Sequence, residues 1–529
     1  MTTIVDRAAS RTARSAADGP TTYGNWARPR TPGLIPRLGI VGSAGLLAGI
    51  VLVLLTAQAR GFTAGVAALV LLLAGLAPAL YRSPAGRNGW QVAAGQAGWA
   101  AGKARGQHLY LAAKVPPRPG DGPPVAFGQH RLPGLLASSR LFEVATPTGQ
   151  RVALVHVPAA RHYTVQLGIA PEGDALVDQD TIDTWVAGWA GWLGNLGHEP
   201  ALVAAVVTVE AAPDPGHRLA AEVGRQITGG CPAFAADVLR ECAATYPAAA
   251  PDVTARVALT FSAKRDDVSE RAIGSRRTRR PRTRTAEEMG QLVLSRLPGL
   301  LAGLAGTGAG EVTPLSAAGL ARTVRVAYDP AVADELDAAA ASGQDIPVSW
   351  DEAGPVAAVE AFESYRHDSA ASVTWSMVDA PRGAVTSRVL AALLGECKGA
   401  LRKRVTLTFR PHRAGDAAAI VDADVRTAIG WEGARAGEAK ATETAALAAA
   451  RQTAREEAAG AGLTRFALLV TVTADPAALE QVAEQAVQLG RASRLRLRRC
   501  YGSQAAAFAA ALGVGLVLPA HVASTGAAP

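Results

Sequence analysis

Anion binding is the chemistry that the side chains of this sequence suggest most clearly. The segment Arg271 to Glu288 reads RAIGSRRTRRPRTRTAEE. Guanidinium groups bind phosphate oxygens, and each basic residue near an anionic membrane adds ~1 kcal/mol of attraction. We interpret six of its arginines as candidate anion-binding residues: Arg276, Arg277, Arg279, Arg280, Arg282 and Arg284. Three hypotheses stay open for this segment: a solvated loop, a surface for anionic lipid, or a DNA-binding surface without interleaved aromatic residues for base stacking.

The common catalytic motifs are not found in this sequence. No G-x-x-x-x-G-K-[ST] segment occurs, so the sequence predicts no phosphate-binding loop backed by a lysine. The GHEPA segment at Gly197 lacks the second histidine of H-E-x-x-H, and the Ser, His and Asp residues around His367 lie too close together for a triad. We therefore expect a non-enzymatic protein without a catalytic, cofactor or metal site. An enzyme with an unrecognised site is the weaker alternative.

Three tryptophans could form a surface of a different kind. Trp185, Trp189 and Trp192 are spaced four and three residues apart, which places them on one face of a helix that begins near Asp180. We expect this stripe to pack in the core or against a neighbouring domain. The alternative is a platform for a ligand.

Composition favours a partner with negative charge. The chain has 529 residues and a formal net charge of +8, which suits a lipid surface or nucleic acid. Its four cysteines are scattered without a C-x-x-C pair. The sequence thus predicts neither a disulfide framework nor a zinc site, and it fits a reducing compartment.

Two long apolar stretches precede these polar features. Residues 38–58 and 61–81 are uncharged and rich in Leu, Val and Ala. A helix of about 20 apolar residues can cross the ~30 Å hydrocarbon core of a bilayer, and the short connection at Arg60 predicts a helical hairpin. A cleaved signal peptide or two buried core helices are the alternatives.

The distribution of Lys and Arg predicts the orientation of this hairpin. The flanks are basic, whereas the tip holds only Arg60. The basic residues of the flanks are Arg7, Arg11, Arg14, Arg28, Arg30 and Arg37 before the hairpin, and Arg82, Arg87, Lys103, Arg105 and Lys114 after it. Because basic flanks stay in the cytoplasm, we expect a multi-pass protein of the bacterial inner membrane with both termini cytoplasmic.

The rest of the chain alternates strands and helices, which predicts an α+β cytoplasmic domain. We divide the chain by composition into a disordered basic tail (1–37), the hairpin (38–81), a juxtamembrane segment with a proline-rich linker (82–128), two α+β units (129–345 and 346–522) and a short tail (523–529).

Two matches suggest that the α+β unit is duplicated. Residues 256–265 resemble residues 404–413, and residues 324–336 resemble residues 469–482, with Arg322 to Pro330 expected to contain a strand. The two matched segments lie a nearly equal number of residues apart in each half of the chain. This favours two ferredoxin-like units with helices on a mixed sheet. Chance similarity in an Ala-rich and Val-rich chain is the alternative.

The apolar stretch SQAAAFAAALGVGLVLPAHV, residues 503–522, could be a third span. Alanine contributes little to membrane insertion, and glycines interrupt the stretch. We expect a packing helix of the soluble domain.

The same region carries a family resemblance. Residues 474–519 resemble the end of the N-terminal domain of CagE/TrbE-type conjugation ATPases, with Gln504, Phe508, Leu512 and Pro519 in similar places, but the motor domain is absent. The preceding hairpin resembles PrgI. The combination is similar to a family of membrane proteins from actinobacterial conjugative elements.

This resemblance implies a scaffold that docks a separate hexameric ATPase, within a homo- or hetero-oligomer. The alternative is a membrane-tethered protein that binds nucleic acid or anionic lipid through the arginine-rich segment.

Overall fold

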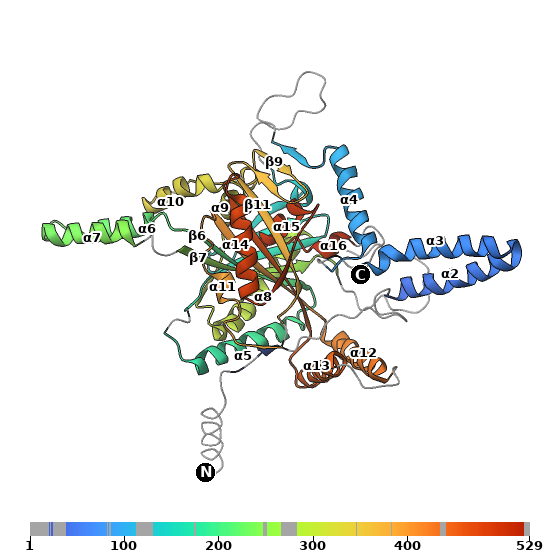
Figure 1. Ribbon diagram of the computed structural model, residues 1–529. Helices are drawn as coiled ribbons and strands as arrows, with labels where there is room; N and C mark the ends of the chain where they lie inside the picture. The colour runs from blue at the N-terminus through green and yellow to red at the C-terminus, as the bar shows by residue number, and fades with distance from the viewer. Residues whose placement is uncertain are drawn as a thin grey trace, which may run out of the picture.

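Two apolar helices form a hairpin that projects from the rest of the molecule (Figure 1). They are α2 (Gly39–Arg60) and α3 (Phe62–Leu80), with Gly61 at a positive φ of 91° between them. Within each helix, 19 residues are apolar enough to span a membrane, and only 6% of either window is buried. At Gly65 an added Cβ would lie 2.6 Å from the Ala57 side chain, so small residues let the two helices approach closely. The predicted helical hairpin is confirmed.

The computed structural model describes residues 21, 23–24, 39–81, 83, 86–112, 131–173, 176–246, 251–265, 283–344, 346–381, 383–433 and 441–522. Most of the predicted tail and all of the proline-rich stretch 114–128 lie outside these residues. After the hairpin, α4 (Gly89–Ala104) begins with a capping box between Asn88 and Gln91, in a segment for which no helix was expected.

One antiparallel sheet of 13 strands forms the body of the protein. Its strands are β2 (Leu109–Leu111), β3 (Arg140–Ala145), β4 (Arg151–Val157), β5 (His162–Ala170), β6 (Leu202–Pro213), β7 (Pro251–Ser262), β8 (Glu311–Pro314), β9 (Ala357–Glu360), β10 (Tyr365–His367), β11 (Ala370–Asp379), β13 (Arg402–Pro411), β14 (Thr464–Ala474) and β15 (Arg496–Arg499). The strands follow the order β2-β9-β10-β11-β14-β13-β6-β7-β5-β4-β3, with β15 on β11 and β8 on β5. All named pairs are antiparallel, whereas a mixed sheet was expected.

Two ferredoxin-like units lie within this sheet. The first runs β5–α5–β6–β7–α8–β8, with α5 at Gln179–Leu196 and α8 at Ala286–Leu304. The second runs β11–α11–β13–β14–α14–β15, with α11 at Ala391–Leu394 and α14 at Leu479–Ala492. Both units place their strands in the order fourth, first, third, second, and the second strands β6 and β13 join the units. The predicted duplication is therefore confirmed.

The sequence matches that suggested the duplication do not pair equivalent elements. Residues 324–336 lie in helices α9 (Ala317–Tyr328) and α10 (Ala333–Ala341), not in a strand. The physical reason is the spacing of Leu320, Val324 and Ala327, which buries one helical face after the Ser316 cap. The other match also pairs elements that are not equivalent. Residues 256–262 lie in β7, the third strand of the first unit, whereas residues 404–411 lie in β13, the second strand of the second unit.

Each unit carries a helical hairpin between its second and third strands. In the first unit this hairpin is α6 (His217–Gln226) and α7 (Ala233–Thr245), and in the second it is α12 (Ala414–Gly433) and α13 (Ala441–Ala458). The helix between the first and second strands of the second unit is the short α11. Both hairpins extend away from the sheet (Figure 1).

The two faces of the sheet have different character. Helices α5 and α8 cover apolar side chains of the first unit, and α11 and α14 cover those of the second. The opposite face carries buried threonines and is covered by α9 and α15 (Gln504–Ala511). Gln166 donates to the carbonyl of Leu512 at 2.9 Å, and Thr406 donates to that of Ala511 at 2.9 Å. The C-terminal apolar stretch thus packs inside the domain, as predicted.

Candidate functional site

The arginine-rich segment falls almost entirely outside the described residues. Arg276, Arg277, Arg279, Arg280 and Arg282 are among those not described, and only Arg284 can be placed.

The flanks of that segment meet at one position. The guanidinium of Arg284 donates to the carbonyl of Lys264 at 2.9 Å, and Lys264 forms an isolated antiparallel bridge with Thr283. The predicted capping box is present, since Thr285 and Glu288 exchange hydrogen bonds of 2.9 and 3.2 Å. Lys264 and Thr283, on the two sides of the segment that is not described, therefore lie together beside the end of β7.

A pocket of about 310 Å³ lies next to that point, where β6 and β14 begin and β7 and β13 end. We call it the strand-end pocket. Five basic side chains line it: Lys264, Arg410, His412, Arg413 and Arg465. No carboxylate is among the described residues that line the pocket.

Like charges face one another in the strand-end pocket. Arg410 and Arg465 are direct register partners across β13 and β14. Burial, followed by the charge of Arg465, lowers the pKa of Arg410. Burial, Arg465 and Arg410 lower the pKa of His412, against the opposing effect of Asp416. Sequence reasoning missed this pocket because its residues come from strands far apart in the chain.

The tryptophan stripe serves packing. Trp192 is buried and donates through its indole nitrogen to the carbonyl of Leu300 at 3.1 Å. Its ring stacks on Trp189 with centroids 5.0 Å apart, and Trp189 meets Phe409 edge to face. A Cβ added at Gly308 would contact the Trp185 ring, so this ring too lies against the turn after α8.

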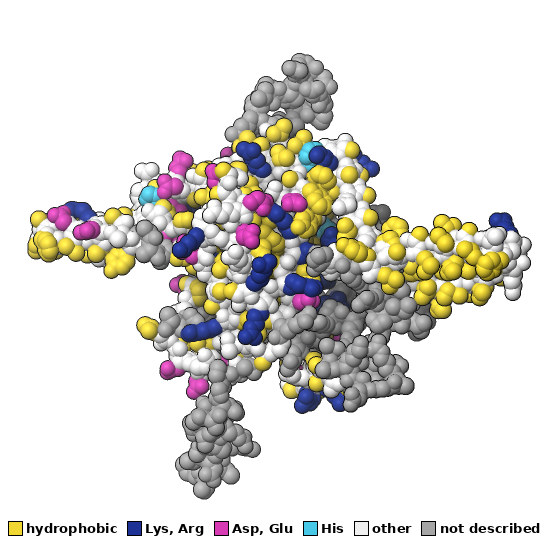
Figure 2. All heavy atoms as spheres, viewed as in Figure 1, with side chains coloured by type: hydrophobic (Ala, Val, Ile, Leu, Met, Phe, Trp, Pro, Cys, Tyr) yellow, Lys and Arg dark blue, Asp and Glu magenta, His cyan; other side chains and the backbone are white. Residues whose placement is uncertain are grey.

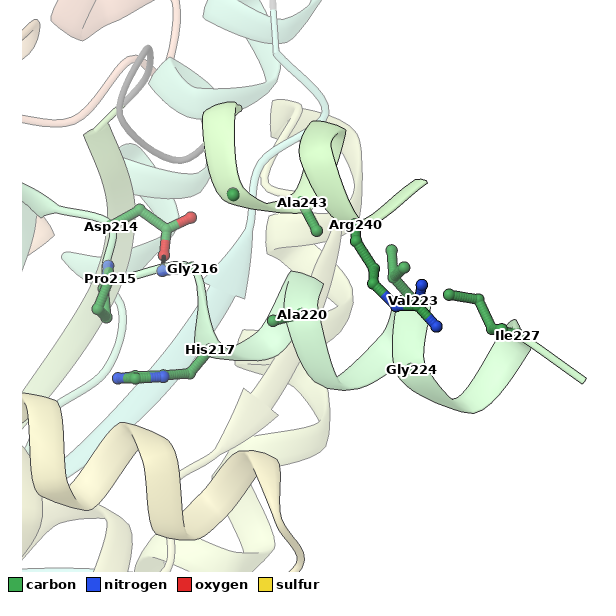
Figure 3. Close-up of a pocket in the computed structure, with 11 residues that line it drawn as sticks. Asp214, Pro215, Gly216, His217, Ala220, Val223, Gly224, Ile227, Arg240 and Ala243 are labelled. Atoms are coloured by element: carbon green, nitrogen blue, oxygen red, sulfur yellow. Dashed lines mark hydrogen bonds between the residues drawn. The ribbon is translucent and has the colours of Figure 1, made fainter. Parts of the chain in front are cut away.

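The α6–α7 hairpin lines a second, open pocket of about 730 Å³ (Figure 3). Asp214 fixes the entry to α6 by accepting a 2.8 Å hydrogen bond from the Gly216 amide. His217 lies 2.6 Å from Asp334 of α10, which ties the base of the hairpin to the body. Ala220 and Ala243 line the cavity from the two helices.

One face of α7 is apolar and exposed. Phe234, Val238, Cys242 and Tyr246 recur every four residues, the spacing of a helical stripe. Phe234 is 80% exposed and Tyr246 66% exposed, whereas Ala236 and Ala243 pack inward. Figure 2 shows apolar side chains gathered along this arm. Exposed apolar patches of this kind are typical of protein–protein or membrane contacts.

A short N-terminal strand contacts the domain. β1 (Tyr23–Gly24) pairs with β12 (Ala384–Val385), and the Thr21 hydroxyl donates to the carboxylate of Asp183 on α5. Residues before the hairpin therefore lie against residues that follow it.

A buried ionic cluster holds the two units together. Glu210 of β6 is 3% exposed and pairs with Arg256 at 2.7 Å, Arg402 at 2.8 Å and Arg404 at 3.2 Å. Burial alone raises the pKa of Glu210, but the three guanidinium groups hold it well below its usual range. This cluster lies within the joined strands, so we assign it a structural role.

No group of three or more His, Cys, Asp or Glu side chains that could hold a metal ion occurs among the described residues. All four cysteines are free. 

One family match covers part of the N-terminal region. Residues 30–91 match a family described as a domain of unknown function (DUF8461), a range that includes the α2–α3 hairpin. No curated protein matches the chain.

Proposed function

We propose that this protein is a non-enzymatic scaffold in the bacterial inner membrane, part of a conjugation or type IV secretion-like apparatus, and that it docks a separate motor ATPase. The exposed apolar face of α7 is the observation that carries this proposal. It lies on an arm anchored by the His217–Asp334 contact and directed away from the sheet. A partner that covers Phe234 and Tyr246 removes their large apolar surfaces from water.

The α2–α3 hairpin supports the membrane part of the proposal. Its two helices are long and apolar, and only 6% of either window is buried, so cover by lipid or partner helices would remove their apolar surface from water. The contact of β1 with β12 supports a shared side for both flanks of the hairpin. Basic flanks make that side the cytoplasm.

The resemblance to the N-terminal domain of conjugation ATPases supports the identity of the partner. Duplicated ferredoxin-like units would offer the ATPase a surface related to its own N-terminal domain. The alternative is a membrane-tethered protein that binds anionic lipid or nucleic acid through the arginine-rich segment. The basic residues at the two ends of that segment favour this alternative.

Affinity purification from native membranes tests the scaffold. We expect the parent protein to retain a chain with Walker motifs, and Phe234→Asp with Val238→Asp to lose it. Ile429→Asp on α12 is the matched control, because Ile429 is also exposed but lies on the other hairpin. Equal retention by all three proteins would contradict docking through α7, and absence of any such chain would contradict the proposed partner.

A further inference from the structure

The strand-end pocket concentrates positive charge: no carboxylate is among the described residues that line it, although Asp416 acts on His412 from outside the lining. Lys264, Arg410 and Arg465 come from three different strand ends. Within the described part of the chain, none of these three side chains forms an ion pair with a carboxylate. Other arginines of the protein are paired, such as Arg265 with Glu288 at 2.7 Å, only one residue from Lys264. The pocket thus differs from its immediate surroundings.

The register of the sheet makes this concentration costly when the pocket is empty. Arg410 and Arg465 stand directly opposite each other, and like charges in such cross-strand pairs destabilise a sheet. Arg410 is partly buried, which weakens the screening of this repulsion by water. An anion between the two guanidinium groups would reverse the sign of the interaction.

We propose that the strand-end pocket is a binding site for a phosphate group. Arg410 and Arg465 would hold its oxygens through paired N–H donors, which match the geometry of a phosphate. Lys264 and His412 line the same cavity and add donors, as does the hydroxyl of Ser262. The volume of about 310 Å³ is at the lower end of the range for small-ligand sites and accommodates a phosphate or a phosphorylated headgroup.

The surroundings favour a small phosphate or a lipid headgroup over nucleic acid. Phe409 directly precedes Arg410, and Phe466 directly follows Arg465. Because successive side chains of a strand alternate, the two rings point to the other face of the sheet. Phe409 is engaged there by Trp189, at a centroid distance of 5.8 Å. No Phe, Tyr or Trp is among the described residues that line the pocket, which leaves no ring for stacking of bases.

The test uses the full-length protein in phosphatidylcholine nanodiscs. Calorimetric titration with inorganic pyrophosphate examines free phosphate, and titration with short-chain phosphatidylglycerol examines the headgroup. We expect at least one of the two to bind, and Arg410→Gln with Arg465→Gln to weaken that binding about tenfold or more, since each charge-assisted hydrogen bond is worth about that factor. Pyrophosphate binding alone identifies a free phosphate as the source, and phosphatidylglycerol binding alone identifies a headgroup.

A matched variant and a folding control make the result decisive. Arg105→Gln with Arg366→Gln removes the same charge from exposed positions outside the pocket, and it should bind as the parent does. The pocket variant should unfold at the same or higher denaturant concentration, because it loses a repulsive pair. The proposal is wrong if neither probe binds, if both variants behave alike, or if a decathymidine binds more tightly than both probes through the same two arginines.

Discussion

The hydroxyl of Tyr23 donates a 3.2 Å hydrogen bond to the carboxylate of Asp183, although Tyr23 precedes the first apolar helix and Asp183 follows the second. The contact closes a loop of the chain around the α2–α3 hairpin. If the hairpin spans a bilayer, this contact places both of its flanks on the same side. It agrees with the orientation that the basic residues predict.

A disulfide crosslink tests this contact. Tyr23 and Val385 are register partners in the β1–β12 pair. In a background with the four native cysteines replaced by serine, Tyr23→Cys with Val385→Cys should crosslink under mild oxidation. Adding Gly24→Ala should suppress the crosslink, because Gly24 has a φ of 139° and a Cβ there would contact the Gly383 carbonyl. Efficient crosslinking in both proteins would show that this strand geometry is wrong.

The joint between the two units should depend on Glu210. Replacing Glu210 with Gln leaves Arg256, Arg402 and Arg404 close together without a counter-charge. Breaking a buried ionic cluster in this way costs about 3–5 kcal/mol in the free energy of unfolding, measured by urea titration. Glu222→Gln affects only exposed contacts on α6, with Arg225 and Gln226, and serves as the control. Equal midpoints for the two variants would contradict the structural role of the cluster.

His367 should make stability depend on pH. Its ring is buried between the Tyr328 carbonyl and the Ser372 hydroxyl, and burial lowers its pKa from 6.5 to about 4. Between pH 6.5 and pH 4, His367 is therefore protonated in the unfolded chain but neutral in the folded protein. Stability should fall by up to about 3 kcal/mol as the pH drops from 6.5 to 4.

His367→Gln removes the titrating imidazole and serves as the comparison when the unfolding free energy is measured against pH. Its unfolding free energy should vary less over that pH range than that of the parent protein. His162 has its pKa lowered to about 4 as well, mainly by burial, so part of the pH dependence should remain in the variant. Identical pH profiles would mean that His367 does not titrate as inferred.

The arginine-rich segment should act by Coulombic attraction if it binds a partner. Replacing Arg276, Arg277, Arg279, Arg280, Arg282 and Arg284 with serine should leave the unfolding midpoint nearly unchanged. Binding to phosphatidylglycerol vesicles at low salt should be lost in this variant, and binding by the parent should weaken as salt rises. Unchanged binding by the variant at low salt would leave only the solvated loop among the three hypotheses.

The sequence predicted the elements with the strongest patterns. The α2–α3 hairpin follows from uninterrupted apolar length, and the start of α8 follows from the Thr285–Glu288 capping box. The strand predicted at Val324 was wrong. The β-branched residues there favour a strand, whereas tertiary packing of Leu320 and Tyr328 selects a helix. Local pattern decides an element only where no distant contact competes.

The candidate sites were harder to predict for a related reason. The strand-end pocket joins Lys264 to Arg410 and Arg465, which only the sheet register brings together. The apolar face of α7 has a readable four-residue spacing, but exposed and buried stripes look alike until the fold is known. Arg-rich composition alone drew attention to the segment beside the pocket and not to the pocket itself.

Cysteine accessibility in intact cells tests the membrane scaffold most directly. In the cysteine-free background, Arg60→Cys places a thiol at the tip of the hairpin, and Thr245→Cys places one on the exposed arm. The account predicts that a membrane-impermeant maleimide labels position 60 in intact cells and labels position 245 only after the membrane is permeabilised. Labelling of position 245 in intact cells, or protection of position 60, would contradict a cytoplasmic domain carried on a membrane hairpin.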